Sequence, residues 1–207
     1  MSRFFSNKFK NLAPYTPGEQ PQERKFIKLN TNESPFPPSK RAQNFAKSEL
    51  SRLMLYPDPE NKRLNDTFAA LLGVKSEQVL FSNGSDEILN FAFMAYCDCN
   101  TPAVFPDITY GFYSVFAEVN GVPCCEIPLK DDFTIKISDY FGANGTIFIA
   151  NPNAPTGIIL PLSDIEEILK ANPDNIVVID EAYIDFGGES AISLIDKYDN
   201  LLVTGTF

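Results

Sequence analysis

The sequence has no histidine among its 207 residues. This absence excludes Ser-His-Asp and Cys-His catalysis and most zinc chemistry, so proton transfer must use Lys, Tyr, Asp, Glu or a cofactor. Cysteine is also scarce, and the spacings C-x-C and C-C match no common zinc pattern. We therefore predict no metal site. We expect small, buried, reduced thiols at the four cysteines, which are Cys97, Cys99, Cys124 and Cys125.

Positive charge and long apolar runs are lacking as well. The net charge is −10 and no basic block is present, which argues against a nucleic-acid surface. No apolar run is long enough to span a membrane. The segment Met1–Lys10 is polar and basic without the apolar stretch of a secretory signal, so we expect a cytoplasmic protein.

The composition is that of a globular protein, with 44% hydrophobic and 21% charged residues. From residue 79 onward, short apolar strands alternate with helices. This alternation predicts an α/β fold with a mostly parallel sheet and flanking helices. Strands are expected at 79–81, 102–106, 122–127, 146–150, 176–180 and 201–204. Helices are expected at 87–96, 109–119 and 163–170, the last with a capping box of Ser163 and Glu166.

The first third of the chain has a different pattern. Its proline-rich start predicts an extended arm and a polar loop, with a short strand at 26–29. Two helices follow, with Ser39 and Asp58 as caps, Pro59 at the first position of the second helix and Gly73 as its stop. We therefore divide the chain into an arm (1–38), a helical segment (39–74) and a sheet domain (75–207).

One strand ends in two acidic residues and a tyrosine. A run of apolar, mostly β-branched residues at 176–179 predicts a strand that is buried on both faces. Asp180 and Glu181 follow, and then Tyr183. Open parallel sheets bind ligands at the carboxyl ends of their strands. Asp180 and Tyr183 therefore suggest a ligand with a basic nitrogen and a phenolic oxygen, the alternative being a solvated acidic turn.

The turn Gly84-Ser85-Asp86 lies between a predicted strand and the start of a helix. Free N–H groups and the helix dipole at such a position bind phosphate or another anion, and Ser85 can add a hydroxyl. Asp86 can instead cap the helix. The turn has neither a G-x-G-x-x-G nor a Walker A pattern, so neither a dinucleotide nor a nucleoside triphosphate is implied. The alternative is a plain strand–helix turn.

Two further strand ends carry groups that could contact a ligand. Tyr110 follows the strand at 102–106, where its ring can stack on a planar ligand or fill the core. The loop 151–157 contains two prolines and a glycine, which fix its path. An asparagine in this loop can aim its amide at a ligand oxygen, unless the loop is only a structural turn. A phosphorylated pyridine ring would satisfy all four strand ends, and this ligand is pyridoxal 5′-phosphate (PLP).

Longer segments match a known family in order along nearly the whole chain. They are NLAPYTPGEQP at 11–21, KLNTNESPFPP at 28–38, YPDP at 56–59, NGSDEIL at 83–89, residues 107–113, residues 151–157 and DEAY at 180–183. With these segments the chain resembles the fold-type I PLP-dependent aminotransferases, and most closely the histidinol-phosphate aminotransferases. The resemblance implies PLP as cofactor, a phosphorylated amino substrate with 2-oxoglutarate and glutamate, and a homodimer serving histidine biosynthesis.

The resemblance also implies roles for single residues. Asp180 would pair with the protonated ring nitrogen, and a carboxylate there keeps the ring cationic and a better electron sink. Tyr183 would hydrogen-bond the ring's 3′-oxygen, and Tyr110 would stack on the ring. The remaining implied contacts are Gly84, Ser85 and Asp86 with the phosphate, Tyr56 with the cofactor phosphate of the other subunit, Tyr15 with the substrate phosphate across the dimer, and Asn32 on the substrate side.

Two departures from the family pattern matter. The asparagine that normally precedes Pro-Thr-Gly and contacts the 3′-oxygen is Ala154 here, so Asn153 takes over that contact or Tyr183 acts alone. The family's lysine that binds PLP covalently follows a Thr-Phe that matches Thr206-Phe207, and the chain contains no lysine in that context. Lys170 and Lys197 come closest in sequence. We therefore expect an N-terminal portion of the enzyme that is inactive and poorly stable by itself.

Rival functions remain open on the sequence. A threonine-phosphate decarboxylase of cobalamin synthesis resembles this family and also handles a phosphorylated amino substrate. A non-catalytic remnant that binds PLP weakly, or an interaction module, is a second alternative. A nicotinamide-dependent Rossmann domain is disfavoured because the glycine fingerprint is missing.

Overall fold

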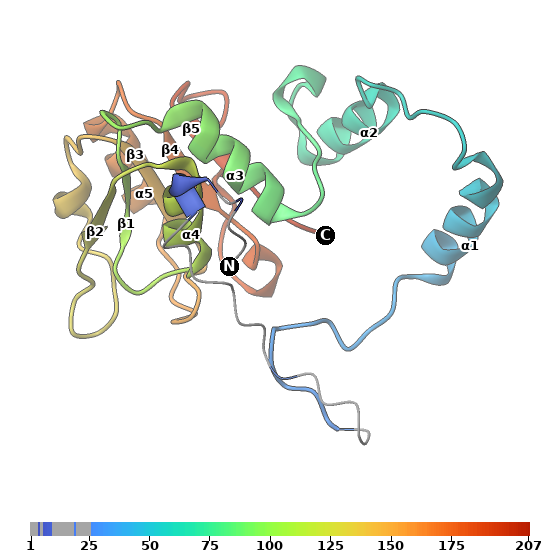
Figure 1. Cartoon of the computed structure of the whole chain (residues 1–207), viewed down its shortest axis with the longest axis horizontal. Helices are drawn as coiled ribbons and strands as arrows, with labels where there is room; N and C mark the ends of the chain where they lie inside the picture. Colours follow the sequence, from blue (N-terminus) through green and yellow to red (C-terminus); the bar gives the residue numbers. More distant parts are fainter. Residues whose placement is uncertain (1–3, 5, 10–18, 20–25) are drawn as a thin grey trace. The chain divides into compact units, whose positions relative to one another are not determined.

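The computed structural model describes residue 4, residues 6–9, residue 19 and residues 26–207 (Figure 1). The chain forms two compact units, one of Met1–Leu12 with Arg63–Phe207 and one of Ala13–Lys62. The arm residues 11–18 and 20–21, including Tyr15, lie outside the described residues. The division into arm, helical segment and sheet domain stays a prediction.

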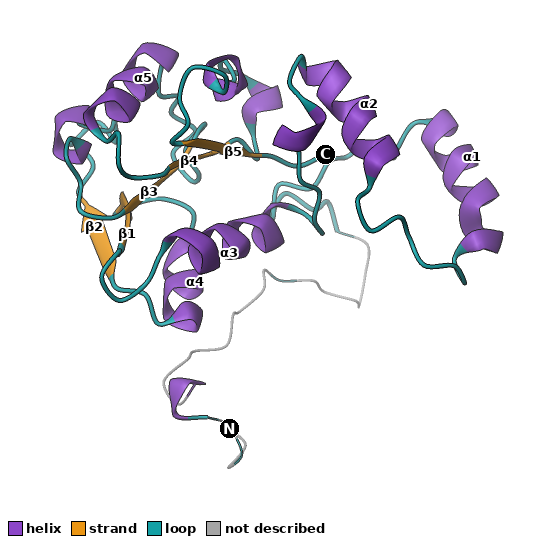
Figure 2. Cartoon of the chain, turned by 90° about the horizontal axis from the view of Figure 1, so that it is seen from above, coloured by secondary structure: helices purple, strands orange, loops and turns teal. Residues whose placement is uncertain are grey.

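The larger unit is built on a five-stranded parallel sheet with the order β2-β1-β3-β4-β5. This sheet confirms the predicted α/β fold. Figure 2 shows α3 and α4 on one face of the sheet and α5 on the other. The strands are β1 (Ala103–Pro106), β2 (Cys124–Ile127), β3 (Thr146–Ala150), β4 (Val177–Asp180) and β5 (Leu201–Thr204). The helices of this unit are α2 (Lys62–Leu72), α3 (Ser85–Tyr96), α4 (Phe112–Asn120) and α5 (Leu162–Ala171).

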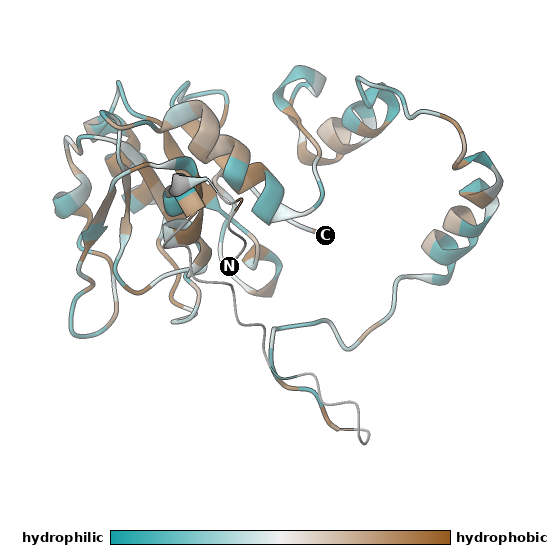
Figure 3. Ribbon diagram, in the orientation of Figure 1, coloured by the Kyte–Doolittle hydropathy of each residue, from teal (hydrophilic) through white to brown (hydrophobic). Residues whose placement is uncertain are grey.

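The central strands are apolar because helices cover both of their faces (Figure 3). Val178 belongs to the core under α3 and α4, together with Phe93 and Phe148, whose rings stack 4.2 Å apart. Its neighbours Val177 and Ile179 belong to the core on the α5 face. The side-chain period of two therefore places Asp180 on the same side as Val178, toward α3 and α4.

The helices begin at other residues than the sequence predicts. α3 begins at Ser85, and α4 begins at Phe112 rather than at residue 109. The predicted capping box of α5 is wrong, because its N-cap is Pro161 and forms no side-chain bond. Glu166 is bonded instead to residues near β5. Short 3-10 helices cover Asn7–Phe9, Leu50–Arg52, Ser76–Gln78, Ile137–Tyr140, Ile184–Phe186 and Ala191–Leu194.

The helical segment confirms most of its predicted end signals. Ser39 caps α1 (Lys40–Glu49) by accepting a hydrogen bond from the Ala42 backbone N–H at 3.2 Å. Asp58 accepts from the backbone N–H of Lys62 at 2.9 Å, but α2 begins at Lys62, so the start predicted at Pro59 is wrong. Gly73 follows the last residue of α2 with φ of +73°, as predicted for a C-terminal glycine.

Two predicted strands are wrong. Residues 26–29 and 79–81 form no strand, and Leu80 is 70% exposed. Phe81 packs instead on Phe68, with ring centroids 5.3 Å apart.

The expectation of buried thiols holds for Cys97 alone, since the other three cysteines are exposed; all four are free. Among the described residues, no helix is long and apolar enough to cross a lipid bilayer.

Candidate active site

The carboxyl ends of β1, β3 and β4 bring polar residues that were predicted to contact a ligand to one edge of the sheet, whereas the fourth predicted strand, at 79–81, does not form. Asp180 ends β4. Its hydrogen-bond partners are Tyr113 on α4, Ala182 just after β4 and Thr204 at the end of β5. The loop after β3 is bonded to the loop after β1. In a parallel sheet this edge is where ligands bind.

Asp180 is buried, with 4% of its surface exposed, and it is held by three neutral donors. The Tyr113 hydroxyl donates to Oδ2 at 2.9 Å, while the Ala182 N–H and the Thr204 hydroxyl donate to Oδ1 at 3.3 Å each. Burial raises the pKa of Asp180, and the three donors oppose this rise. In the described part of the chain, no lysine or arginine forms an ion pair with it.

The N-terminus of α3 has an open geometry. Its N-cap, Gly84, has φ of +79° and offers no side chain to the first-turn N–H groups. A side chain at this φ would be strained, so glycine suits the position. The Glu87 carboxylate accepts instead from the Asn83 N–H, at 2.7 Å. The N–H groups of Ser85 and Asp86 are therefore at a helix start that can bind an anion.

Tyr110 connects this helix start to the sheet edge. Its hydroxyl donates to Asp86 Oδ1 at 2.7 Å. Its ring stacks on Phe112 with centroids 5.7 Å apart and meets the Tyr113 ring edge-on at 85°. Burial and the Asp86 carboxylate raise the pKa of Tyr110 well above its usual range. The phenol is therefore a permanent donor to the Asp86 carboxylate, which lies in the first turn of α3.

Asn153 is 5% exposed and connects two loops. Its Nδ2 donates to the Ile108 carbonyl and to Thr156 Oγ1, both at 3.0 Å, and its Oδ1 accepts from Thr109 Oγ1 at 2.8 Å. The peptide bonds before Pro152 and Pro155 are cis. The amide of Asn153 thus fixes the path of the loop 151–157, and the predicted contact of Asn153 with a cofactor stays a prediction.

Glu181 has a role that the sequence patterns did not indicate. Its buried carboxylate accepts from the Ser190 hydroxyl and the Ala191 N–H, both at 2.6 Å. Burial raises the pKa of Glu181. These bonds close the segment 181–191, which carries the half-buried Tyr183. The signal available in the sequence was the adjacent pair Asp180 and Glu181. Neighbouring residues at a strand end point to opposite sides, so the two carboxylates have different surroundings.

Tyr113 and Thr204 were also missed as partners of Asp180. Tyr113 lies three residues after Tyr110, on a segment whose aromatics can stack on a ligand but more often pack in the core. The other predicted contacts lie in the Ala13–Lys62 unit, where Tyr56 is fully exposed and Asn32 is exposed with φ of +53°. Their predicted roles stay predictions, as does that of Tyr15.

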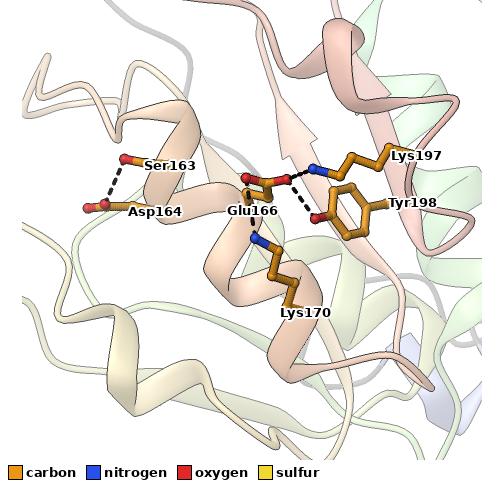
Figure 4. Close-up of polar contacts among 6 residues, drawn as sticks. All are labelled: Ser163, Asp164, Glu166, Lys170, Lys197 and Tyr198. Atoms are coloured by element: carbon orange, nitrogen blue, oxygen red, sulfur yellow. Dashed lines mark hydrogen bonds and ion pairs between the residues drawn. The ribbon is translucent and has the colours of Figure 1, made fainter.

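The two lysines nearest in sequence to the expected position both pair with Glu166. Figure 4 shows Lys170 and Lys197 pointing at different oxygens of this carboxylate. The Tyr198 hydroxyl donates to Oε1 at 2.7 Å. Lys170 precedes β4 and Lys197 precedes β5. Both therefore lie toward the amino ends of these strands, whereas Asp180 lies at a carboxyl end. A four-residue strand separates the two ends by roughly 10 Å.

Comparison with known proteins decides the family. The pattern of the family described as aminotransferase class I and II matches residues 24–207. The chain belongs to this family. It is 54% identical over 211 residues to histidinol-phosphate aminotransferase 2 of Dechloromonas aromatica (strain RCB). That alignment covers 100% of this chain and 59% of the relative, so the chain spans about three fifths of the relative's length.

Solved aminotransferase structures share the fold. Histidinol-phosphate aminotransferase from Sinorhizobium meliloti, in complex with pyridoxal-5'-phosphate, superposes with a TM-score of 0.78 at 22% identity. The match covers 86% of this chain and 50% of that one. L-threonine-O-3-phosphate decarboxylase from Porphyromonas gingivalis matches with a TM-score of 0.69 at 22% identity, over 81% of this chain and 50% of that one. At these identities both structures show the fold alone.

Proposed function

We propose that this chain forms the cofactor-binding part of a PLP-dependent aminotransferase that acts on histidinol phosphate, with 2-oxoglutarate as amino acceptor. One observation carries the proposal: the Asp180 carboxylate is buried at the sheet's carboxyl edge with neutral donors around it. A buried carboxylate without a cation is costly. A ligand with a protonated ring nitrogen would supply the missing positive charge.

The residues at this edge fit the chemistry of PLP. The α3 start, with Gly84 as its bare N-cap, suits the phosphate. Tyr110 presents an aromatic ring between this helix start and Asp180, since its hydroxyl donates to Asp86 and its ring meets that of Tyr113, which donates to Asp180. Tyr183, on the turn just after β4, is proposed to donate to the 3′-oxygen of the ring.

When bound, PLP supplies an electron sink that stabilises negative charge at the substrate's α-carbon. The chain's own residues would prepare that chemistry. Asp180 would keep a proton on the ring nitrogen, and a low-dielectric surrounding would strengthen this charge pair. The α3 N–H groups would orient the phosphate, and Tyr110 would exclude water from one face of the ring. Asn153 keeps the loop 151–157 in place beside these groups.

The remaining assignments are carried by the family resemblance of the sequence segments rather than by the geometry. We propose a cytoplasmic homodimer in which Tyr56 reaches the cofactor phosphate in the second subunit, and Tyr15 and Asn32 serve the substrate side. The name of the 54% identical relative favours histidinol phosphate. Threonine-phosphate decarboxylation is the second candidate, because such decarboxylases resemble this family in sequence and also handle a phosphorylated amino substrate.

The first test is binding of pyridoxamine 5′-phosphate (PMP) to the 207-residue chain by calorimetry. PMP carries the same ring and phosphate as PLP but no aldehyde, so it cannot react with surface lysines. We expect binding with one site per chain, and no glutamate formation from histidinol phosphate and 2-oxoglutarate. Absence of PMP binding by a chain that circular dichroism shows to be folded would refute the cofactor assignment.

The substrate is tested separately with the complete reading frame that encodes this chain. We expect it to restore growth of a histidine auxotroph that lacks histidinol-phosphate aminotransferase. Carbon dioxide release from threonine phosphate, without growth of the auxotroph, would favour the decarboxylase instead.

A further inference from the structure

Tyr113 is the strongest donor to Asp180 and has no part in the function described so far. Its side chain is completely buried. Three aromatic rings surround it, those of Phe105, Tyr110 and Phe148, with centroids 5.7 to 5.8 Å away. This packing fixes the direction of the hydroxyl, which donates to Asp180 Oδ2 at 2.9 Å.

The state of the Tyr113 phenol is also fixed. Burial and the adjacent Asp180 carboxylate hold the pKa of Tyr113 well above its usual range. The hydroxyl therefore stays protonated and can only donate to a charged Asp180. Among the groups that oppose the effect of burial on the pKa of Asp180, the Tyr113 hydroxyl is the largest.

A buried carboxylate and a ring nitrogen compete for one proton. Burial makes the carboxylate a stronger base, and in a dry site the proton can move to Asp180 and leave an uncharged pair. A hydrogen bond donated to the carboxylate makes it a weaker base. The proton then stays on the nitrogen, and the ring keeps its positive charge.

We propose that Tyr113 is a positioning residue that acts through Asp180: its hydroxyl holds Oδ2 and keeps the shared proton on the ring nitrogen of the cofactor. This inference rests on the proposed function, since it requires a ring with a basic nitrogen at this edge. Thr204 gives weaker support on the other oxygen, where its distance is 3.3 Å.

The test compares PMP with its deaza analogue, in which C–H replaces the ring nitrogen, on the 207-residue chain and on Tyr113→Phe. We expect Tyr113→Phe to weaken PMP binding by about tenfold, in line with the loss of one hydrogen bond to a charged group. Binding of the deaza analogue should change by less than about twofold, because no proton is shared. With ¹⁵N in the ring of PMP, the nitrogen resonance should move toward the unprotonated value in Tyr113→Phe.

Tyr140→Phe is the matched control. Tyr140 is equally buried, but it packs in the core on the α5 face, and its hydroxyl has no hydrogen-bond partner within the described residues. We expect neither binding nor the resonance to change. Thr204→Val should move the resonance in the same direction as Tyr113→Phe but by less, which tests the inference independently if Tyr113→Phe folds poorly.

Equal losses for PMP and the deaza analogue in Tyr113→Phe would mean that the residue only supports the fold, and would overturn the inference. An unchanged nitrogen resonance in both Tyr113→Phe and Thr204→Val would overturn it as well. Failure of the unaltered chain to bind either compound, while circular dichroism shows it to be folded, would overturn the proposed function itself.

Discussion

Asp180 and Glu166 are two carboxylates of the same sheet unit in opposite surroundings. Each contacts three groups, but those around Glu166 include Lys170 and Lys197 (Figure 4), whereas those around Asp180 are all neutral. The two lysines and the Tyr198 hydroxyl lower the pKa of Glu166 to about 2, while burial raises that of Asp180. Neutral donors orient a carboxylate without cancelling its charge, so only Asp180 keeps a charge for a ligand.

The largest expected effect is on Asp180. Asp180→Asn removes the charge that would pair with the ring nitrogen, and we expect PMP affinity to fall by about 100-fold, as for a buried charge pair that loses one partner. Calorimetric titration measures this loss. Glu166→Gln is the matched control and should leave the affinity unchanged. Equal affinities for Asp180→Asn and the unaltered chain would remove the basis of the comparison.

The second effect is on stability, at the neighbouring carboxylate. Glu181→Ala leaves the Ser190 hydroxyl and the Ala191 N–H without their acceptor. We expect the free energy of unfolding to fall by about 1–3 kcal/mol, measured by urea denaturation. Ser190→Ala removes one of the two donors and should cost less. A stability equal to that of the unaltered chain would show that water replaces the carboxylate.

The pH dependence of stability should have opposite signs in the two regions. The pKa of Glu166 is lowered from 4.5 to about 2, so its contribution is present above pH 4.5 and is lost as the pH falls toward 2. The pKa values of Asp180 and Glu181 are raised. Their contribution is therefore present below their ordinary values of 3.8 and 4.5, and is lost as the pH rises through the raised values of the folded chain.

Thermal melts followed by circular dichroism across this pH range test the signs. The stability that Glu166→Gln loses relative to the unaltered chain should be smallest at the acid end of the range. Asp180→Asn and Glu181→Gln should instead compare most favourably with it above the raised pKa values. The same pH trend in all three variants would contradict the assignment of opposite environments.

The smallest effect is expected for Lys170→Ala. Lys170 is more than half exposed, and its nitrogen lies 3.4 Å from Glu166 Oε2. Exposed ion pairs contribute little, so we expect the Tm to change by less than about 2 °C. A much larger fall would mean that the contacts of Glu166 with Lys170, Lys197 and Tyr198 anchor α5 to the segment before β5.

Part of the site follows from the sequence because its signals are local. The apolar run before Asp180 predicts a buried strand, and the end of such a strand is where ligands bind. The contacts of Asp180 with Tyr113, 67 residues away, and with Thr204, 24 residues away, follow no local pattern. Only the order of the strands brings these residues together.

The errors in the predicted fold have the same origin. Ser163 and Glu166 have the spacing of a capping box. The Glu166 carboxylate is bonded instead to Lys197 and Tyr198, which lie 31 and 32 residues away in the sequence. The run at 79–81 has strand-forming residues, but among the described residues no strand pairs with it. Propensity cannot report whether a neighbouring strand is present.

The three donors around Asp180 also imply an order of events during folding. Tyr113 comes from α4 and Thr204 from β5, so the carboxylate is enclosed only after both have docked on β4. Parallel strands joined by long crossovers form late, because loop closure precedes the contacts that stabilise them. Given PMP binding, recovery of that binding after dilution from urea should lag behind the recovery of helical circular dichroism. The recovery of PMP binding would then report when the last long-range contacts of the sheet form.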